Sequence, residues 1–82
     1  MPVKVTIYSR PGCHLCDDMK DLVRKVARTI PLTLEDIDIY GDDELENRYS
    51  LEIPVLFVNG VRVATARIKE DALIRVLTSA SL

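Results

Sequence analysis

The sequence has little of several residue types: its 82 residues include no tryptophan, one phenylalanine, one histidine and two cysteines. Two cysteines and one histidine are too few soft ligands for a structural zinc site within one chain, because such sites take about four. An excess of positive charge is also missing, since 11 Lys and Arg face 13 Asp and Glu, for a net charge of -2. We therefore expect no nucleic acid and no membrane surface among the partners.

Long hydrophobic runs are absent as well. The longest apolar run covers residues 54–58, far short of the ~20 residues that span a bilayer, and the first residues lack the layout of a signal peptide. We therefore expect a cytoplasmic protein in a reducing thiol pool, where paired cysteines are more often catalytic or metal-binding than structural. The length predicts a single domain over residues 1–82 with a thin core, and we expect a monomer.

The spacing of the apolar residues predicts seven elements. Alternation with a period of two predicts strands, helical spacing predicts helices, and Pro31 and the hairpin dipeptide Asn59-Gly60 predict breaks. In chain order these are a strand over 3–8, a helix from 14 to about 29, a strand over 32–39, a helix over 43–49 capped by Asp42, strands over 55–58 and 61–64, and a helix around 72–77. A strand-helix-strand opening requires a right-handed crossover and parallel pairing, and the hairpin adds antiparallel strands. The predicted fold class is α/β, a βαβαββα chain with a four-stranded mixed sheet flanked by helices.

The stretch YSRPGCHLCDDMK, residues 8–20, contains both cysteines. Cys13 follows a Pro-Gly turn at the predicted start of a helix, where free N–H groups and the helix dipole stabilise a thiolate. Cys16 lies one helical turn further on the same side, within reach of the Cys13 sulfur. A C-x-x-C pair in a strand-helix-strand pattern favours dithiol exchange, with Cys13 as the nucleophile and Cys16 as the resolving cysteine.

Two other interpretations of the cysteine pair stay open. As a structural staple, the disulfide would close a loop of about four residues and remove only ~2 kcal/mol of unfolded-chain entropy, against ~4.7 kcal/mol for a loop of 100. As a metal site, the pair would need a second chain, because two chains together offer four thiolates to a metal ion or an iron-sulfur cluster. That alternative is a non-catalytic binding module.

Charged residues surround the cysteines in the sequence. A protonated His14 would favour the Cys13 thiolate, whereas Asp17 and Asp18 would oppose it. Arg10, three residues before Cys13, is a candidate for supporting the thiolate or binding an anion. A further acidic group, expected on a solvated strand face away from the cysteines, comprises Glu35, Asp36 and Asp38.

These stretches resemble the glutaredoxin-like proteins of the thioredoxin superfamily over nearly the whole chain. YSRPGCHLC is similar to the glutaredoxin active-site stretch, in which a basic residue, here Arg10, stands three positions before the first cysteine. EIPVLFVNG is similar to the second signature, in which an apolar residue and a proline precede an apolar strand and Asn-Gly. The resemblance implies the minimal thioredoxin fold and a cis peptide at Ile53-Pro54, where the main chain of Ile53 would pair with an extended substrate.

The chain departs from glutaredoxins after the hairpin. Where they carry a Gly-Gly pair and acidic residues for the γ-glutamyl end of glutathione, this sequence has Ala64, Thr65, Ala66 and Arg67. Side chains here hinder a close approach of glutathione, while Arg67 could receive a carboxylate of the substrate. We expect a thiol-disulfide oxidoreductase with no bound cofactor that reduces protein disulfides or glutathione mixed disulfides, so that its partner is a disulfide-containing protein or a small thiol. Its reductant would be glutathione or, with a slight preference, a thioredoxin-reductase-like protein.

Overall fold

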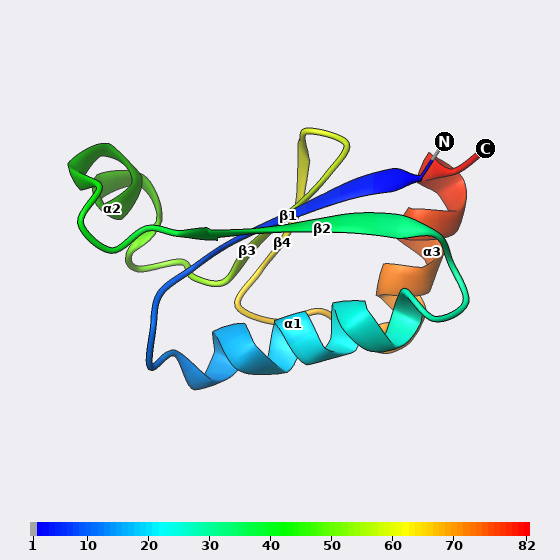
Figure 1. Cartoon of the computed structure of the whole chain (residues 1–82), viewed down its shortest axis with the longest axis horizontal. Helices are drawn as coiled ribbons and strands as arrows, with labels where there is room; N and C mark the ends of the chain where they lie inside the picture. Colours follow the sequence, from blue (N-terminus) through cyan, green and yellow to red (C-terminus); the bar gives the residue numbers. More distant parts are fainter. Residues whose placement is uncertain (1) are drawn as a thin grey trace.

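The computed structural model describes residues 2–82 as a sheet with helices packed around it (Figure 1). In chain order the elements are β1 (Val3–Ser9), α1 (His14–Val26), β2 (Leu32–Asp38), α2 (Asp43–Tyr49), β3 (Val55–Val58), β4 (Val61–Thr65) and α3 (Glu70–Ala80). The predicted βαβαββα order is therefore confirmed. No helix among residues 2–82 combines the length and the apolar composition that crossing a membrane requires.

The sheet is mixed and has the strand order β2-β1-β3-β4. β1 pairs in parallel with β2, whereas β3 runs antiparallel to both β1 and β4. The β3–β4 turn consists of Asn59 and Gly60, whose φ angles of 50° and 82° lie in the left-handed region that these two residue types tolerate best. The Asn59 side chain also accepts a hydrogen bond of 3.0 Å from the Lys4 amide, which ties the turn to β1.

The larger core lies between one face of the sheet and the helices α1 and α3. Alternate residues of β1 and β3 point to this face, where they meet the apolar sides of the two helices. Figure 1 shows α1 lying along the sheet, with α3 beside it and α2 at the far end. The buried members of this core are Val3, Val5, Ile7, Met19, Val23, Val26, Leu56, Val58, Leu73 and Leu77.

A smaller cluster lies on the other face and holds α2. Tyr49 of α2 stacks on Tyr8 of β1, with ring centroids 4.5 Å apart, and Phe57 of β3 meets the Tyr8 ring edge-on at 5.5 Å. Ile39 and Val55 are buried beside them. Asp42 accepts a hydrogen bond from the Leu45 amide at the start of α2, so the predicted N-cap is confirmed.

The prediction that α1 runs to about residue 29 is wrong by three residues. α1 ends at Val26, although the next amide, that of Ala27, still donates to the Val23 carbonyl at 2.9 Å. The amide of Arg28 then bonds the carbonyl three residues back, Lys25, at 3.2 Å. The last turn therefore tightens into a 3₁₀-like turn ahead of Pro31, as helix ends commonly do.

Candidate active site

Cys13 is the N-cap of α1. The chain leaves β1 at Ser9 and turns through Gly12, whose φ of 76° suits glycine. Cys13 itself has an extended backbone with φ of -94°, and its Sγ accepts a hydrogen bond of 3.1 Å from the Cys16 amide. An acceptor at the N-cap takes a hydrogen bond from one of the free amides of the first turn. This bond and the helix dipole favour a negative charge on the acceptor. The sequence thus builds a site for a thiolate at this position.

The two cysteines form a disulfide with a Cα–Cα distance of 5.2 Å. Cys13 is half-buried, whereas Cys16 is fully buried in the first turns of α1. Of the two cysteines, Cys13 is therefore the one that solvent reaches. The division into a nucleophilic and a resolving cysteine stays a prediction.

The Ile53-Pro54 peptide is cis, as the resemblance implies, and Pro54 is buried. Val55 pairs with Tyr8, so this segment lies at the end of the sheet from which the cysteine turn emerges. The Ile53 amide donates to the Tyr49 carbonyl at 3.0 Å, while the Pro54 carbonyl accepts from the Ala66 amide at 2.8 Å. The Ile53 amide and the Pro54 carbonyl are thus both bonded within the chain.

Arg10 and His14 contact carboxylates rather than the sulfur atoms. The Arg10 guanidinium pairs with Glu46 of α2 and is about one-third exposed. His14 is 89% exposed and lies 3.6 Å from Asp18, one turn further along α1. Arg10 thus links the cysteine turn to α2, and His14 points into solvent along the outside of the helix.

The prediction that Asp36 is exposed on a strand is confirmed, but the structure places it beside α1, the helix that begins at the cysteine pair. Its carboxylate accepts hydrogen bonds of 2.8 Å from Ser9 Oγ and from Lys20 Nζ of α1. A hollow of about 200 Å³ beside the start of α1 brings Asp36 together with Asp17 and Asp38. Partial burial alone would raise the pKa of Asp36. The hydrogen bonds from Lys20 and Ser9 outweigh this effect, so the pKa lies below its usual value.

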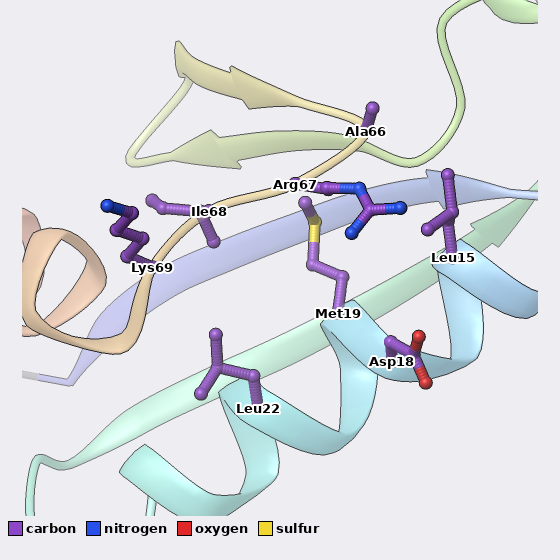
Figure 2. A pocket seen from close by; sticks show the side chains of 8 residues that line it. All are labelled: Leu15, Asp18, Met19, Leu22, Ala66, Arg67, Ile68 and Lys69. Atoms are coloured by element: carbon purple, nitrogen blue, oxygen red, sulfur yellow. The ribbon is translucent and has the colours of Figure 1, made fainter.

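A groove of about 590 Å³ runs between α1 and the segment that joins β4 to α3 (Figure 2). Arg67, Asp18 and Ala66, which the sequence drew attention to for other reasons, lie in this groove, whereas its apolar residues were not expected to form a site. The signal for them is an apolar stripe at helical spacing that begins between the two cysteines. The residues that line the groove are Leu15, Asp18, Met19, Leu22, Ala66, Arg67, Ile68 and Lys69.

His14 and several carboxylates lie near the cysteines, among them Asp17, Asp36 and Asp38. Within residues 2–82, no group of three or more His, Cys, Asp and Glu side chains is placed to hold a metal ion. The structure brings Cys13, Cys16, Pro54 and Arg67 to one end of the molecule, and it leaves the His14 side chain exposed beside Asp18.

Comparison with known families identifies the fold and its relatives. The model of the glutaredoxin-like domain family (DUF836) matches residues 4–78. The chain belongs to this glutaredoxin-like family. A glutaredoxin-like relative, the "YDR286C homolog" of Dictyostelium discoideum, is 26% identical over 77 residues, covering 87% of this chain and 71% of that protein.

Solved structures of similar chains share the fold of this protein. Protein Ne2328 of Nitrosomonas europaea is 30% identical with a TM-score of 0.80, over 94% of this chain and 93% of that chain. Protein XcR50 of X. campestris is also 30% identical, with a TM-score of 0.78 over 93% and 97%. A thioredoxin of Halobacterium salinarum, 24% identical over 98% and 75% with a TM-score of 0.69, shows the shared thioredoxin-like fold. A C-x-x-C pair on this glutaredoxin-like fold indicates a redox function.

Proposed function

We propose that this glutaredoxin-like protein is a thiol-disulfide oxidoreductase. The proposal rests on the half-buried Cys13 at the start of α1. Its sulfur accepts a hydrogen bond from the Cys16 amide and forms a disulfide with the fully buried Cys16. A staple would gain little from a loop this short, whereas an accessible sulfur at a helix N-terminus favours the nucleophilic thiolate. The interpretation as a thiol module that holds a metal or cluster between two chains is the rival.

The reaction transfers two electrons from the dithiol to a disulfide. The Cys13 thiolate attacks one sulfur of the substrate disulfide, and the other substrate sulfur leaves as a thiolate that takes up a proton. Cys16 then loses its proton and attacks the Cys13 sulfur, which releases the second substrate thiol. The enzyme ends with the Cys13–Cys16 disulfide and needs a dithiol reductant or two thiol molecules to regain both protons and electrons.

We further propose that the substrate is a protein disulfide or a mixed disulfide with a small thiol, reduced in the cytoplasm. The Ile53 carbonyl beside Pro54 would accept a main-chain bond from an extended substrate. Ala64 and Thr65 occupy the place of a glycine pair, which favours a protein reductant of the thioredoxin-reductase type over glutathione. The protein acts as a monomer in this proposal.

A redox titration in glutathione buffers of graded ratio tests the proposed function. Free thiols are trapped by alkylation and counted by intact mass, and metal content is measured on the same sample. We expect a reversible loss of two hydrogens that links Cys13 to Cys16 at one potential. If both thiols stayed reduced across the series, or if bound metal protected them from alkylation, the oxidoreductase proposal would fail and the metal-binding module would take its place.

Serine variants separate the two sulfur roles. Cys13→Ser should abolish reduction of a small disulfide such as 2-hydroxyethyl disulfide, because no accessible thiolate remains. Cys16→Ser should keep the first attack and accumulate a mixed disulfide at Cys13, visible as an added mass that a reductant removes. Full activity in Cys13→Ser would end the proposal.

A further inference from the structure

The groove beside the cysteines has an apolar floor. Leu15 stands between the two cysteines, and Met19, only 3% exposed, continues the floor one turn along α1. Ile68 closes the other side, and Figure 2 shows its side chain pointing toward Leu22. The volume of about 590 Å³ lies within the roughly 300–1,000 Å³ of well-formed ligand pockets. An unbranched methionine adapts to different apolar side chains, so the floor suits a bound peptide.

The rim of the groove carries free positive charge. Arg67 and Lys69 are exposed, and neither forms an ion pair with any of residues 2–82. Figure 2 shows Arg67 reaching over Met19 toward Leu15. An unpaired guanidinium beside an apolar floor fits a carboxylate that follows an apolar side chain.

Of the acidic residues near this rim, Glu70 and Asp71 pair with cations elsewhere, whereas Asp18 itself lines the groove and contacts only His14, which is charged only when protonated. Asp18 lies 3.6 Å from His14, and Glu70, next to Lys69, pairs with Lys25 at 2.8 Å. Asp71 lies 3.4 Å from Arg75 within α3. Among residues 2–82, no carboxylate pairs with Arg67 or Lys69, so these two cations outnumber the one acidic residue, Asp18, that lines the groove.

The backbone holds Arg67 in place. Ala66 has φ of 65°, and the Arg67 amide donates to the Thr65 carbonyl at 2.7 Å, which closes a three-residue turn of a rare and strained kind. The Ala66 amide also bonds the Pro54 carbonyl at 2.8 Å. The groove wall is thus fastened to the cis-proline segment, which lowers the cost of ordering the site when a partner binds.

We propose that this groove selects the protein partner: it receives a segment in which an apolar side chain next to the reactive cysteine is flanked by Asp or Glu. The apolar side chain lies on Leu15 and Met19, and the carboxylate pairs with Arg67, assisted by Lys69. This inference rests on the proposed oxidoreductase function and names its substrate class as acidic-apolar protein segments that carry a disulfide.

Synthetic peptide disulfides test this selectivity. Three peptides of equal length each contain one cysteine, which is disulfide-bonded to 2-mercaptoethanol. The two residues after the cysteine are Leu-Glu, Leu-Lys or Ser-Glu. Fully reduced protein is mixed with each in a single turnover, and acid-quenched samples are read by intact mass. We expect the Leu-Glu peptide to react about fivefold faster than the Leu-Lys peptide, since one partly exposed ion pair is worth up to ~1 kcal/mol. It should also react faster than the Ser-Glu peptide, which lacks the apolar side chain that the groove floor would bury.

Charge reversal at the rim provides the matched variant. Arg67→Glu should invert the preference between the Glu and Lys peptides. Arg28→Glu makes the same change at an exposed arginine beyond the far end of α1 and should leave the preference as it is. In wild-type protein the preference should shrink in 0.5 M salt, because exposed charges are screened there.

The outcomes separate this inference from the function beneath it. Equal rates for all three peptides, or an unchanged preference in Arg67→Glu, would overturn the groove proposal. Glutathione disulfide reacting faster than every peptide would overturn it as well, because the site would then serve the small thiol. Uncharged 2-hydroxyethyl disulfide is the reference substrate. If the wild-type protein reduces it, the oxidoreductase proposal holds even where the groove proposal fails. If the wild-type protein does not reduce it, both proposals fail.

Discussion

Ala66 holds a backbone conformation that costs a non-glycine residue free energy. Its φ of 65° is left-handed, which costs an L-residue about 1–2 kcal/mol. We predict that Ala66→Gly removes this cost, while the extra freedom of glycine in the unfolded chain takes back about 0.4–1 kcal/mol. The free energy of unfolding should therefore rise by about 0.5 kcal/mol, measured by urea denaturation of the oxidised protein.

The matched control for Ala66→Gly lies two residues earlier. Ala64 is in β4, outside the left-handed region, so Ala64→Gly should lower the free energy of unfolding by about 1 kcal/mol. The two substitutions thus have opposite signs. A loss of stability in both variants would show that the Ala66 conformation is not strained in solution.

Asp36 should make stability depend on pH in the acid range. Its pKa lies below the usual value because the bonds from Lys20 and Ser9 outweigh its partial burial. The stabilisation is complete above the ordinary carboxyl pKa of about 3.9 and is lost as the pH falls from there through the lower folded-state pKa. Asp36→Asn should lower the free energy of unfolding at pH 7 by about 0.5–1 kcal/mol and flatten its decline below about pH 4.

The neighbouring Glu35→Gln provides the comparison for Asp36→Asn. Glu35 meets Lys4 at 3.5 Å with both side chains at least half exposed, so its loss should change stability by only a few tenths of a kcal/mol. Denaturation curves at a series of pH values measure both variants. Identical pH profiles for Asp36→Asn and Glu35→Gln would contradict the contact between Asp36 and α1.

The first turn of α1 depends on an acceptor at residue 13. Because Cys13 Sγ accepts the Cys16 amide, a serine oxygen can take over this cap, whereas alanine cannot. Under reducing conditions we predict that Cys13→Ser unfolds with a free energy close to that of wild type, and Cys13→Ala with about 1 kcal/mol less. Equal stability of the two variants, measured by urea denaturation with dithiothreitol present, would mean that the reduced cysteine does not cap the helix.

The order and type of the elements could be predicted because each carries a local signal. Apolar and polar residues alternate along β1, Asp42 caps α2, and Asn59-Gly60 forms the hairpin turn. The structure agrees with the prediction for each of these elements. The end of α1 was missed because Pro31 marks only the limit of the helix. Where the last turn tightens before that limit depends on packing.

The tertiary partners of the site could not be predicted in the same way. The cysteine pair is a local motif, and the Pro54 segment followed from resemblance. The bond between Lys20 and Asp36 requires a particular register of β2 beside β1, and a slip of one residue would turn Asp36 to the other face. The Arg10–Glu46 pair likewise depends on where α2 packs.

At the scale of the whole molecule, the sheet separates two apolar clusters of unequal size. The larger one joins β1 and β3 to α1 and α3, while the smaller one around Tyr49 holds α2 and the approach to Pro54. Local opening costs least where few buried apolar contacts hold an element. The α2 side, with its one buried helix residue, is therefore the part that should open before the rest.

Hydrogen exchange on two core variants tests this difference between the faces. Leu73 is fully buried in the larger cluster, so Leu73→Ala should lower the free energy of unfolding by about 2–5 kcal/mol. It should also speed amide exchange throughout β1, β3 and α1. Tyr49→Ala should instead speed exchange mainly in α2 and residues 50–53, with β1 and α1 keeping most of their protection, because α2 can undock while the larger cluster stays packed. A uniform loss of protection in Tyr49→Ala, equal to that in Leu73→Ala, would mean that the two clusters unfold as one cooperative unit and that α2 does not open separately.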